Sequence, residues 1–165
     1  MSSKREQVLE AMAALIEAAL PDADVKRNLA KPERIPVGGL VIIRDGDPGE
    51  PETTLSPLTY IYTHRIPIEI AVHQTPQPRE QALDALLGPI GVAVAGNRTL
   101  GGLCDFVEAA APATEDVETA GAVAGRWADL AIIAVYRPHG SGVRTDQGTR
   151  YPGVVFVAKI VSLGD

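Results

Sequence analysis

Residues 58–72 alternate between apolar and polar side chains over a stretch two to three times longer than a usual β-strand. Every even position but one is apolar or aromatic, with His64 as the exception, and most odd positions are polar. Such a strand would span roughly 50 Å, whereas a compact chain of this length has a radius of gyration of about 15 Å. We therefore expect a half-buried strand that extends beyond the body of the protein and contacts another molecule. Pro67 lacks a backbone donor, so it predicts an edge, a bulge or a bend, in one bent strand or in two shorter strands that share a register.

Two helices and several shorter strands are expected around this strand, in an α+β fold with a mostly antiparallel sheet and both helices packed on one face. Ser2 or Ser3 is expected to cap the first helix, with Glu6 completing a capping box with Ser3, and Pro21 is expected to end the helix. The second helix is expected to open at Thr75 and to be kinked or interrupted at Gly88-Pro89. The apolar stripes of the two helices are Val8, Leu9, Met12, Leu15, Ile16 and Leu20, and Ala82, Leu83, Leu86, Leu87 and Ile90.

The other segments follow from turn residues and apolar runs. Short strands are expected at residues 23–28, 39–44 and 103–109, and a long one at residues 124–137. The acidic stretch Asp45–Thr54 is expected to be irregular, and Pro112–Glu118 to connect to the last strand. We expect one domain over residues 1–138 and a C-terminal extension over residues 139–165, in which the β-prone run Gly153–Val161 would be an extra strand or part of a flexible tail.

Charge and cysteine content exclude several classes of protein. The formal net charge of −6 and the scattered basic residues disfavour direct nucleic-acid binding, which needs clustered Lys and Arg. The single cysteine, Cys104, rules out an intramolecular disulfide and is expected to be a buried structural thiol in a reducing compartment. The sequence has no apolar stretch of the roughly 20 residues that span a bilayer and no secretory signal, so we expect a soluble intracellular protein without a membrane partner.

No pattern in the sequence predicts a catalytic, cofactor or metal site. On one regular strand, His64 and His73 would point to opposite faces and could share a metal ion only through a bulge at Pro67, so a metal site is not expected. The acidic loop lacks the spacing of an EF-hand, and we expect a solvated loop with mutually repelling charges. Ser141, His139 and Asp146 fall in the linker-like tail, where a catalytic triad could not be held in geometry. The protein is therefore expected not to be an enzyme.

The order of these segments resembles the tail terminator (minor tail, tail-completion) proteins of long-tailed bacteriophages and related prophage or gene-transfer particles. The matching segments are Arg5–Leu20, Leu40–Asp47, Tyr60–Val72, Gln81–Leu87, Asn97–Leu103 and Ala128–Tyr136. The chain departs from the family pattern at Gly88-Pro89, which interrupts a helix expected to be continuous, and in residues 139–165, which extend past the usual end.

The resemblance implies a homo-oligomeric ring, expected to be a hexamer, that caps the tail tube, ends tail elongation and presents a surface to the head–tail connector protein. It also implies assembly in the cytoplasm of a bacterial host, with the protein then part of the virion tail. The candidate interface residues on the acidic loop and the long strand are Asp45, Asp47, Glu50, Glu52, Arg65 and Glu69. Two alternatives stay open, namely another head–tail neck or joining component and a small enzyme resembling an acyl-group transferase.

Overall fold

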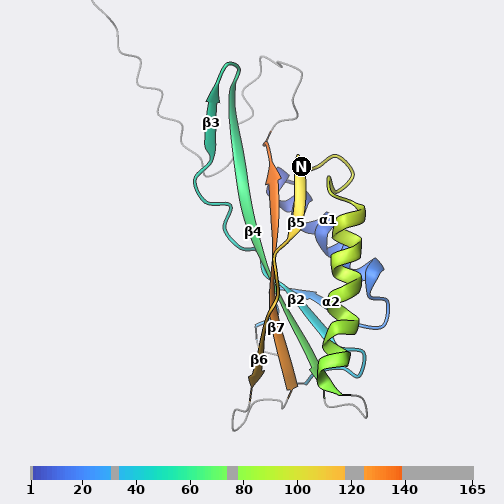
Figure 1. The fold of residues 1–165 in the computed structure, drawn as a ribbon. Coiled ribbons are helices and arrows are strands. Elements are labelled where there is room, and N and C mark those ends of the chain that lie inside the picture. Colours follow the sequence, from blue (N-terminus) through green and yellow to red (C-terminus); the bar gives the residue numbers. More distant parts are fainter. Residues whose placement is uncertain (1, 31–33, 74–77, 118–124, 139–165) are drawn as a thin grey trace, which may run out of the picture.

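The computed structural model describes residues 2–30, 34–73, 78–117 and 125–138 of the chain. In this part of the chain, two helices cover one face of a mixed, mostly antiparallel seven-stranded sheet, which confirms the expected α+β fold (Figure 1). The expected C-terminal extension, with its β-prone run Gly153–Val161, lies outside the described residues.

The order of the strands in the sheet is β1-β2-β4-β7-β5, with β3 beside β4 and β6 beside β7. Only β1 and β2 are parallel, and the other neighbours are antiparallel. Along the chain the elements are α1 (Lys4–Ala19), β1 (Asp24–Arg27), β2 (Leu40–Ile43), β3 (Glu52–Leu55), β4 (Leu58–His73), α2 (Arg79–Gly96), β5 (Phe106–Ala109), β6 (Ala113–Val117) and β7 (Gly125–Tyr136).

The long alternating segment forms one continuous strand, β4, at the centre of the sheet. On one side it pairs with β7 from Tyr62 to His73, and on the other side it pairs first with β3 and then with β2. Pro67 lies just where the pairing with β2 ends, and its carbonyl oxygen still accepts a hydrogen bond of 2.8 Å from the Arg44 amide. The missing N–H of Pro67 is therefore tolerated at a local edge, without dividing the strand.

The even positions of β4 become fully buried from His64 onward, whereas Leu58, Tyr60 and Tyr62 are exposed or half-buried. His64 is thus no exception to the alternation, because its side chain faces the core with 0 % exposure. The end of β4 that projects from the core is the N-terminal end, which forms a hairpin with β3 (Figure 1).

The helices differ from expectation at two points. Ser3 caps α1, and its hydroxyl accepts a hydrogen bond from the Glu6 amide, but the Glu6 carboxylate pairs with Arg27 instead of completing a capping box. Helix α2 begins at Arg79 and continues through Pro89, so of the two expected outcomes at Gly88-Pro89, a kink or an interruption, the interruption is wrong. Burial on both sides of Pro89 holds the helix together, because Leu86, Ile90 and Val94 all lie in the core.

The core has a large part under the helices and a small part on the opposite face of the sheet. The large part joins both helices to the even positions of β4 and β7. The small part consists of Ile35, Leu40, Ile42 and Ala71, with Trp127 packed against them. Strand β2 is buried on both faces, as expected, because its side chains enter both parts.

Two strands lie in segments where none was expected. Strand β3 begins inside the acidic stretch that was expected to be irregular, and β6 lies inside the connection at residues 112–118. Each pairs with one neighbour, β3 with β4 and β6 with β7, and the exposed side chains of β3 show why no apolar pattern signalled it.

Candidate functional site

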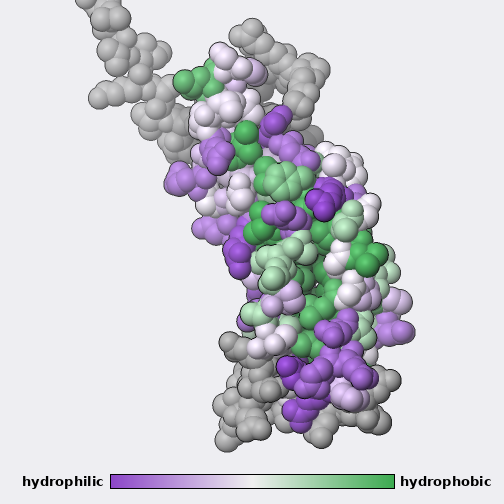
Figure 2. All heavy atoms as spheres, viewed as in Figure 1, coloured by the Kyte–Doolittle hydropathy of each residue, from purple (hydrophilic) through white to green (hydrophobic). Residues whose placement is uncertain are grey.

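The β3–β4 hairpin extends past the part of the sheet that the helices cover (Figure 1). The last pair between β4 and β7 is Tyr62 with Tyr136, so residues 58–61 of β4 continue beyond β7 with β3 as their paired strand. At the tip, Leu55 and Leu58 form a cross-strand pair and are 82 % and 61 % exposed. Figure 2 shows hydrophobic residues at the surface at this end of the molecule. Two exposed leucines on a projecting arm form a surface suited to contact with another molecule.

The connection from β2 to β3 follows the edge of β4. Asp47 forms an isolated antiparallel bridge with Arg65. Gly46 has a φ of +61° and lies so close to β4 that an added Cβ would be 2.1 Å from the Arg65 carbonyl oxygen. Only glycine fits both the left-handed backbone and this close approach. The connection is therefore held against β4, and it positions the acidic side chains that follow.

Asp45 takes part in an ion-pair network that joins the connection to α1 and β1. Its carboxylate accepts a hydrogen bond of 2.8 Å from Arg27, whose guanidinium also pairs with Glu6, and it lies 3.8 Å from the Arg5 guanidinium. Burial raises the pKa of Asp45, but the hydrogen bonds from Arg27 and Asn28 outweigh burial and lower the pKa below its usual value. The hydrogen bond from Arg27 likewise lowers the pKa of Glu6. The expectation of a mutually repelling loop is therefore wrong for Asp45.

Beneath the hairpin, the His64 side chain links the connection between β2 and β3 to strand β7. Its Nε2 lies 2.6 Å from the Asp45 carbonyl oxygen, and its Nδ1 lies 3.3 Å from the Tyr136 hydroxyl. A neutral ring that carries its proton on Nε2 donates to Asp45 and accepts from Tyr136, so both ring nitrogens have partners. Burial lowers the pKa of His64, which favours this neutral form.

Glu69 is the second candidate residue with a structural partner. It forms a two-pronged ion pair with Arg44 at 2.8 Å and 2.9 Å, and Arg44 also donates to the Leu29 carbonyl oxygen. The hydrogen bonds that Arg44 donates to Glu69 raise the pKa of Arg44. This pair links β4 to the segment that covers the small part of the core, so Glu69 acts in the fold.

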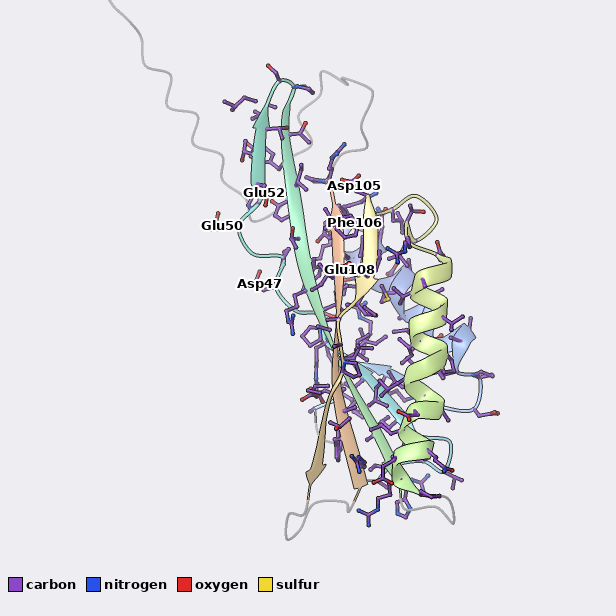
Figure 3. The ribbon with its side chains drawn as sticks, in the orientation of Figure 1. Asp47, Glu50, Glu52, Asp105, Phe106 and Glu108 are labelled. Carbon is purple, nitrogen blue, oxygen red and sulfur yellow. The ribbon has the colours of Figure 1, made fainter. Side chains whose placement is uncertain are left out.

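The other four candidate interface residues are exposed. Asp47, Glu50 and Glu52 lie along the connection and the start of β3 (Figure 3). Arg65 lies on β4, where it forms the bridge with Asp47. The structure therefore divides the six expected interface residues into two internal ion-pair partners and four surface residues.

A second exposed group, which was missed at the level of the sequence, lies on β5 and just before it. Phe106, which is 41 % exposed, lies between the exposed acidic residues Asp105 and Glu108 (Figure 3). Phe106 pairs with Val135 of β7, and Glu108 pairs with Ile133. The acidic residues that flank a large apolar residue were the available signal, because a charge on each side of an aromatic residue is typical of an exposed edge strand.

The described residues include few groups suited to catalysis or metal binding. Among them, no group of three or more His, Cys, Asp or Glu could hold a metal ion. Cys104 is buried, as expected, and burial raises the pKa of its thiol to about 11. A hollow of about 350 Å³ lies on the sheet face opposite the helices, lined by Arg65, Pro67, Ile68, Glu69, Ala111, Ala113, Asp129, Leu130 and Ala131. Within the described ranges, no helix is long and apolar enough to cross a membrane.

No protein-family model matches the chain, and no curated protein matches it.

Proposed function

We propose that this protein is a structural assembly protein of the tail terminator type, from a long-tailed bacteriophage or a related prophage or gene-transfer particle. In this proposal, copies form a ring, expected to be a hexamer, that caps the tail tube and stops its elongation. The ring then presents a surface to the head–tail connector protein. Assembly takes place in the cytoplasm of the bacterial host, and the ring becomes part of the virion tail.

The observation that carries the proposal is the projecting β3–β4 hairpin with its exposed leucine pair, Leu55 and Leu58. Burying a large aliphatic side chain contributes about 1.5–3 kcal/mol, whereas association of two proteins costs roughly 4–15 kcal/mol. The leucine pair alone is therefore insufficient to hold two copies together. A ring supplies further contacts, because each copy meets two neighbours through two different surfaces.

The edge of β3 supports a contact of this kind. In the described part of the chain, β3 pairs with β4 only, so its other edge is available to a strand from a neighbour. The exposed Asp47, Glu50 and Glu52 lie beside this edge and would face the same partner, or line the opening of the ring. Charges at the rim of an interface select partners more than they add affinity.

The test measures particle mass and tube capping for the full chain and a double variant. We expect the native protein to form rings, seen by light scattering and electron microscopy, and to bind the ends of tail tubes assembled from a purified tail tube protein. Leu55→Ser with Leu58→Ser should stay folded but lose ring formation. The matched control is Val37→Ser, because Val37 is 91 % exposed and lies away from the hairpin.

A native protein that stays monomeric at all concentrations and does not associate with tail tubes would overturn the proposal. Binding at the neck without any effect on tube length would instead assign the protein to the head–tail joining components.

A further inference from the structure

Strand β5 forms an open edge of the sheet. It pairs with β7 on one side, and the described residues contain no strand on its other side. Helix α2 packs against the same strand on the helix-covered face. On the opposite face, Phe106 keeps 41 % of its surface exposed. A strand added at this edge would pair with the backbone of β5 and cover part of Phe106.

The edge of β5 carries negative charge. Asp105 and Glu108 are both exposed, and Figure 3 shows them on either side of Phe106. Asp105 also forms an ion pair of 3.2 Å with Arg137, just after the end of β7. A segment that binds here should therefore be apolar and should carry basic residues.

One segment of this chain has this composition. Residues 150–161 (Arg-Tyr-Pro-Gly-Val-Val-Phe-Val-Ala-Lys-Ile-Val) contain two basic residues and no acidic residue, in a chain with a net charge of −6. Within Gly153–Val161 the even positions are all apolar, and the odd positions include the single charge, Lys159. If the even positions of such a strand face α2, Lys159 lies on the other face, together with Val155 and Val157, and this is the face that carries Phe106 and Glu108.

The end of β7 brings the chain next to this edge. Val135 pairs with Phe106, so the chain leaves β7 at Tyr136 beside the start of β5. The described part of the chain ends at Pro138, and residues 139–152 separate it from Gly153. Fourteen residues can span up to roughly 46 Å. Such a short tether also gives the segment a high effective concentration at its own sheet.

We propose that Gly153–Val161 adds to the free edge of β5 in the same copy of the protein, with Lys159 beside Glu108. The proposal goes beyond ring formation and does not depend on it.

The first test is photo-crosslinking in the full chain. A photo-reactive phenylalanine analogue replaces Phe106, and in a control protein it replaces Val92, which is 74 % exposed on α2. We expect the probe at position 106, and not the probe at position 92, to react with the peptide that contains residues 153–161, in a product of monomer mass. Absence of this product would overturn the proposal. The same peptide found only in a product of dimer mass would also overturn it, because the segment would then belong to another copy.

The second test is amide hydrogen exchange in residues 153–161 at low salt. We expect exchange at least 10-fold slower than in an unprotected chain. Glu108→Lys and Lys159→Glu should each speed this exchange roughly 2- to 5-fold, and the double variant should restore it. The control Glu17→Lys changes the same charge on α1, where the side chain is exposed, and should have no effect. Unprotected amides in the native protein, or additive effects without restoration, would refute the assigned contact.

Discussion

Lowering the pH from 7.5 to 5.5 should destabilise this protein through one buried side chain, His64. The folded protein holds the ring neutral, between the Asp45 carbonyl oxygen and the Tyr136 hydroxyl. Burial lowers the pKa of His64 and outweighs the hydrogen bond with the Asp45 carbonyl, which raises it; the charge of the nearby Arg5 lowers the pKa further, against smaller opposite effects of the charges on Asp45 and Asp47. The unfolded chain titrates with a pKa of about 6.5. Below this pH, the unfolded chain therefore binds a proton that the folded protein does not bind.

The sign and size of the effect follow from this difference. The free energy of unfolding has its full value above pH 6.5 and falls as the pH drops from 6.5 toward the pKa of the folded protein. At pH 5.5 the loss is at most about 1.4 kcal/mol, because one bound proton accounts for that amount per pH unit. Glu6 and Asp45 affect the free energy of unfolding only at lower pH. Their pKa values are lowered, so the stability that they contribute is lost only as the pH falls below about 4.5.

Urea unfolding followed by the fluorescence of Trp127, the single tryptophan, measures this free energy between pH 5.5 and 7.5. His64→Leu should lower it by about 2–4 kcal/mol at pH 7.5, because the Asp45 carbonyl and the Tyr136 hydroxyl lose a buried partner. The same variant should abolish the pH dependence. Tyr136→Phe is the matched control, which removes one hydrogen bond but keeps the pH dependence. A His64→Leu protein whose stability falls with pH as steeply as the native protein would refute the reasoning.

Three further perturbations test the fold. Gly46→Ala should cost about 2–4 kcal/mol in urea unfolding and Gly49→Ala only about 1–2 kcal/mol, because both have positive φ but only position 46 lies against β4; equal costs would contradict the close approach. Ile68→Asp places a charge in the core and should cost more than about 4 kcal/mol. Glu69→Lys, on the opposite face, breaks a half-buried ion pair and should lower the free energy of unfolding by only about 1 kcal/mol. A stable Ile68→Asp protein would contradict the register of β4. The thiol of Cys104, with a pKa of about 11, should react with iodoacetamide at pH 8 far more slowly in the folded protein than in urea, and equal rates would show that it is accessible.

Periodic burial made much of the fold predictable from the sequence. The alternation at residues 58–72 identified the longest strand, and the helical stripes identified the faces of α1 and α2 that enter the core. The four other strands expected from apolar runs were found close to their expected bounds. Except in β1, whose side chains are half-buried or exposed, each of these elements has a buried face that its side chains report directly, so a local pattern is sufficient.

The features that were missed depend on interactions that leave no local apolar pattern in the sequence. The partners of Asp45 are Arg27 and Arg5, which are 18 and 40 residues away along the chain, so the loop seemed to hold only like charges. Strand β3 is fully exposed and forms by pairing with β4, which leaves no apolar pattern. Pro89 was expected to interrupt α2 by its local effect, which the burial of its neighbours outweighs.

The continuity of β4 also has a mechanical consequence. A pull on the hairpin tip along the axis of β4 reaches the core without passing through a flexible joint. It is resisted by the ladder of twelve residue pairs that β4 forms with β7. Because the hydrogen bonds of an antiparallel ladder run perpendicular to the strands, such a force loads them in shear, all at once. A sideways force on the tip would instead open the short β3–β4 ladder of four pairs one pair at a time. The arm is therefore stiff along its length and compliant across it.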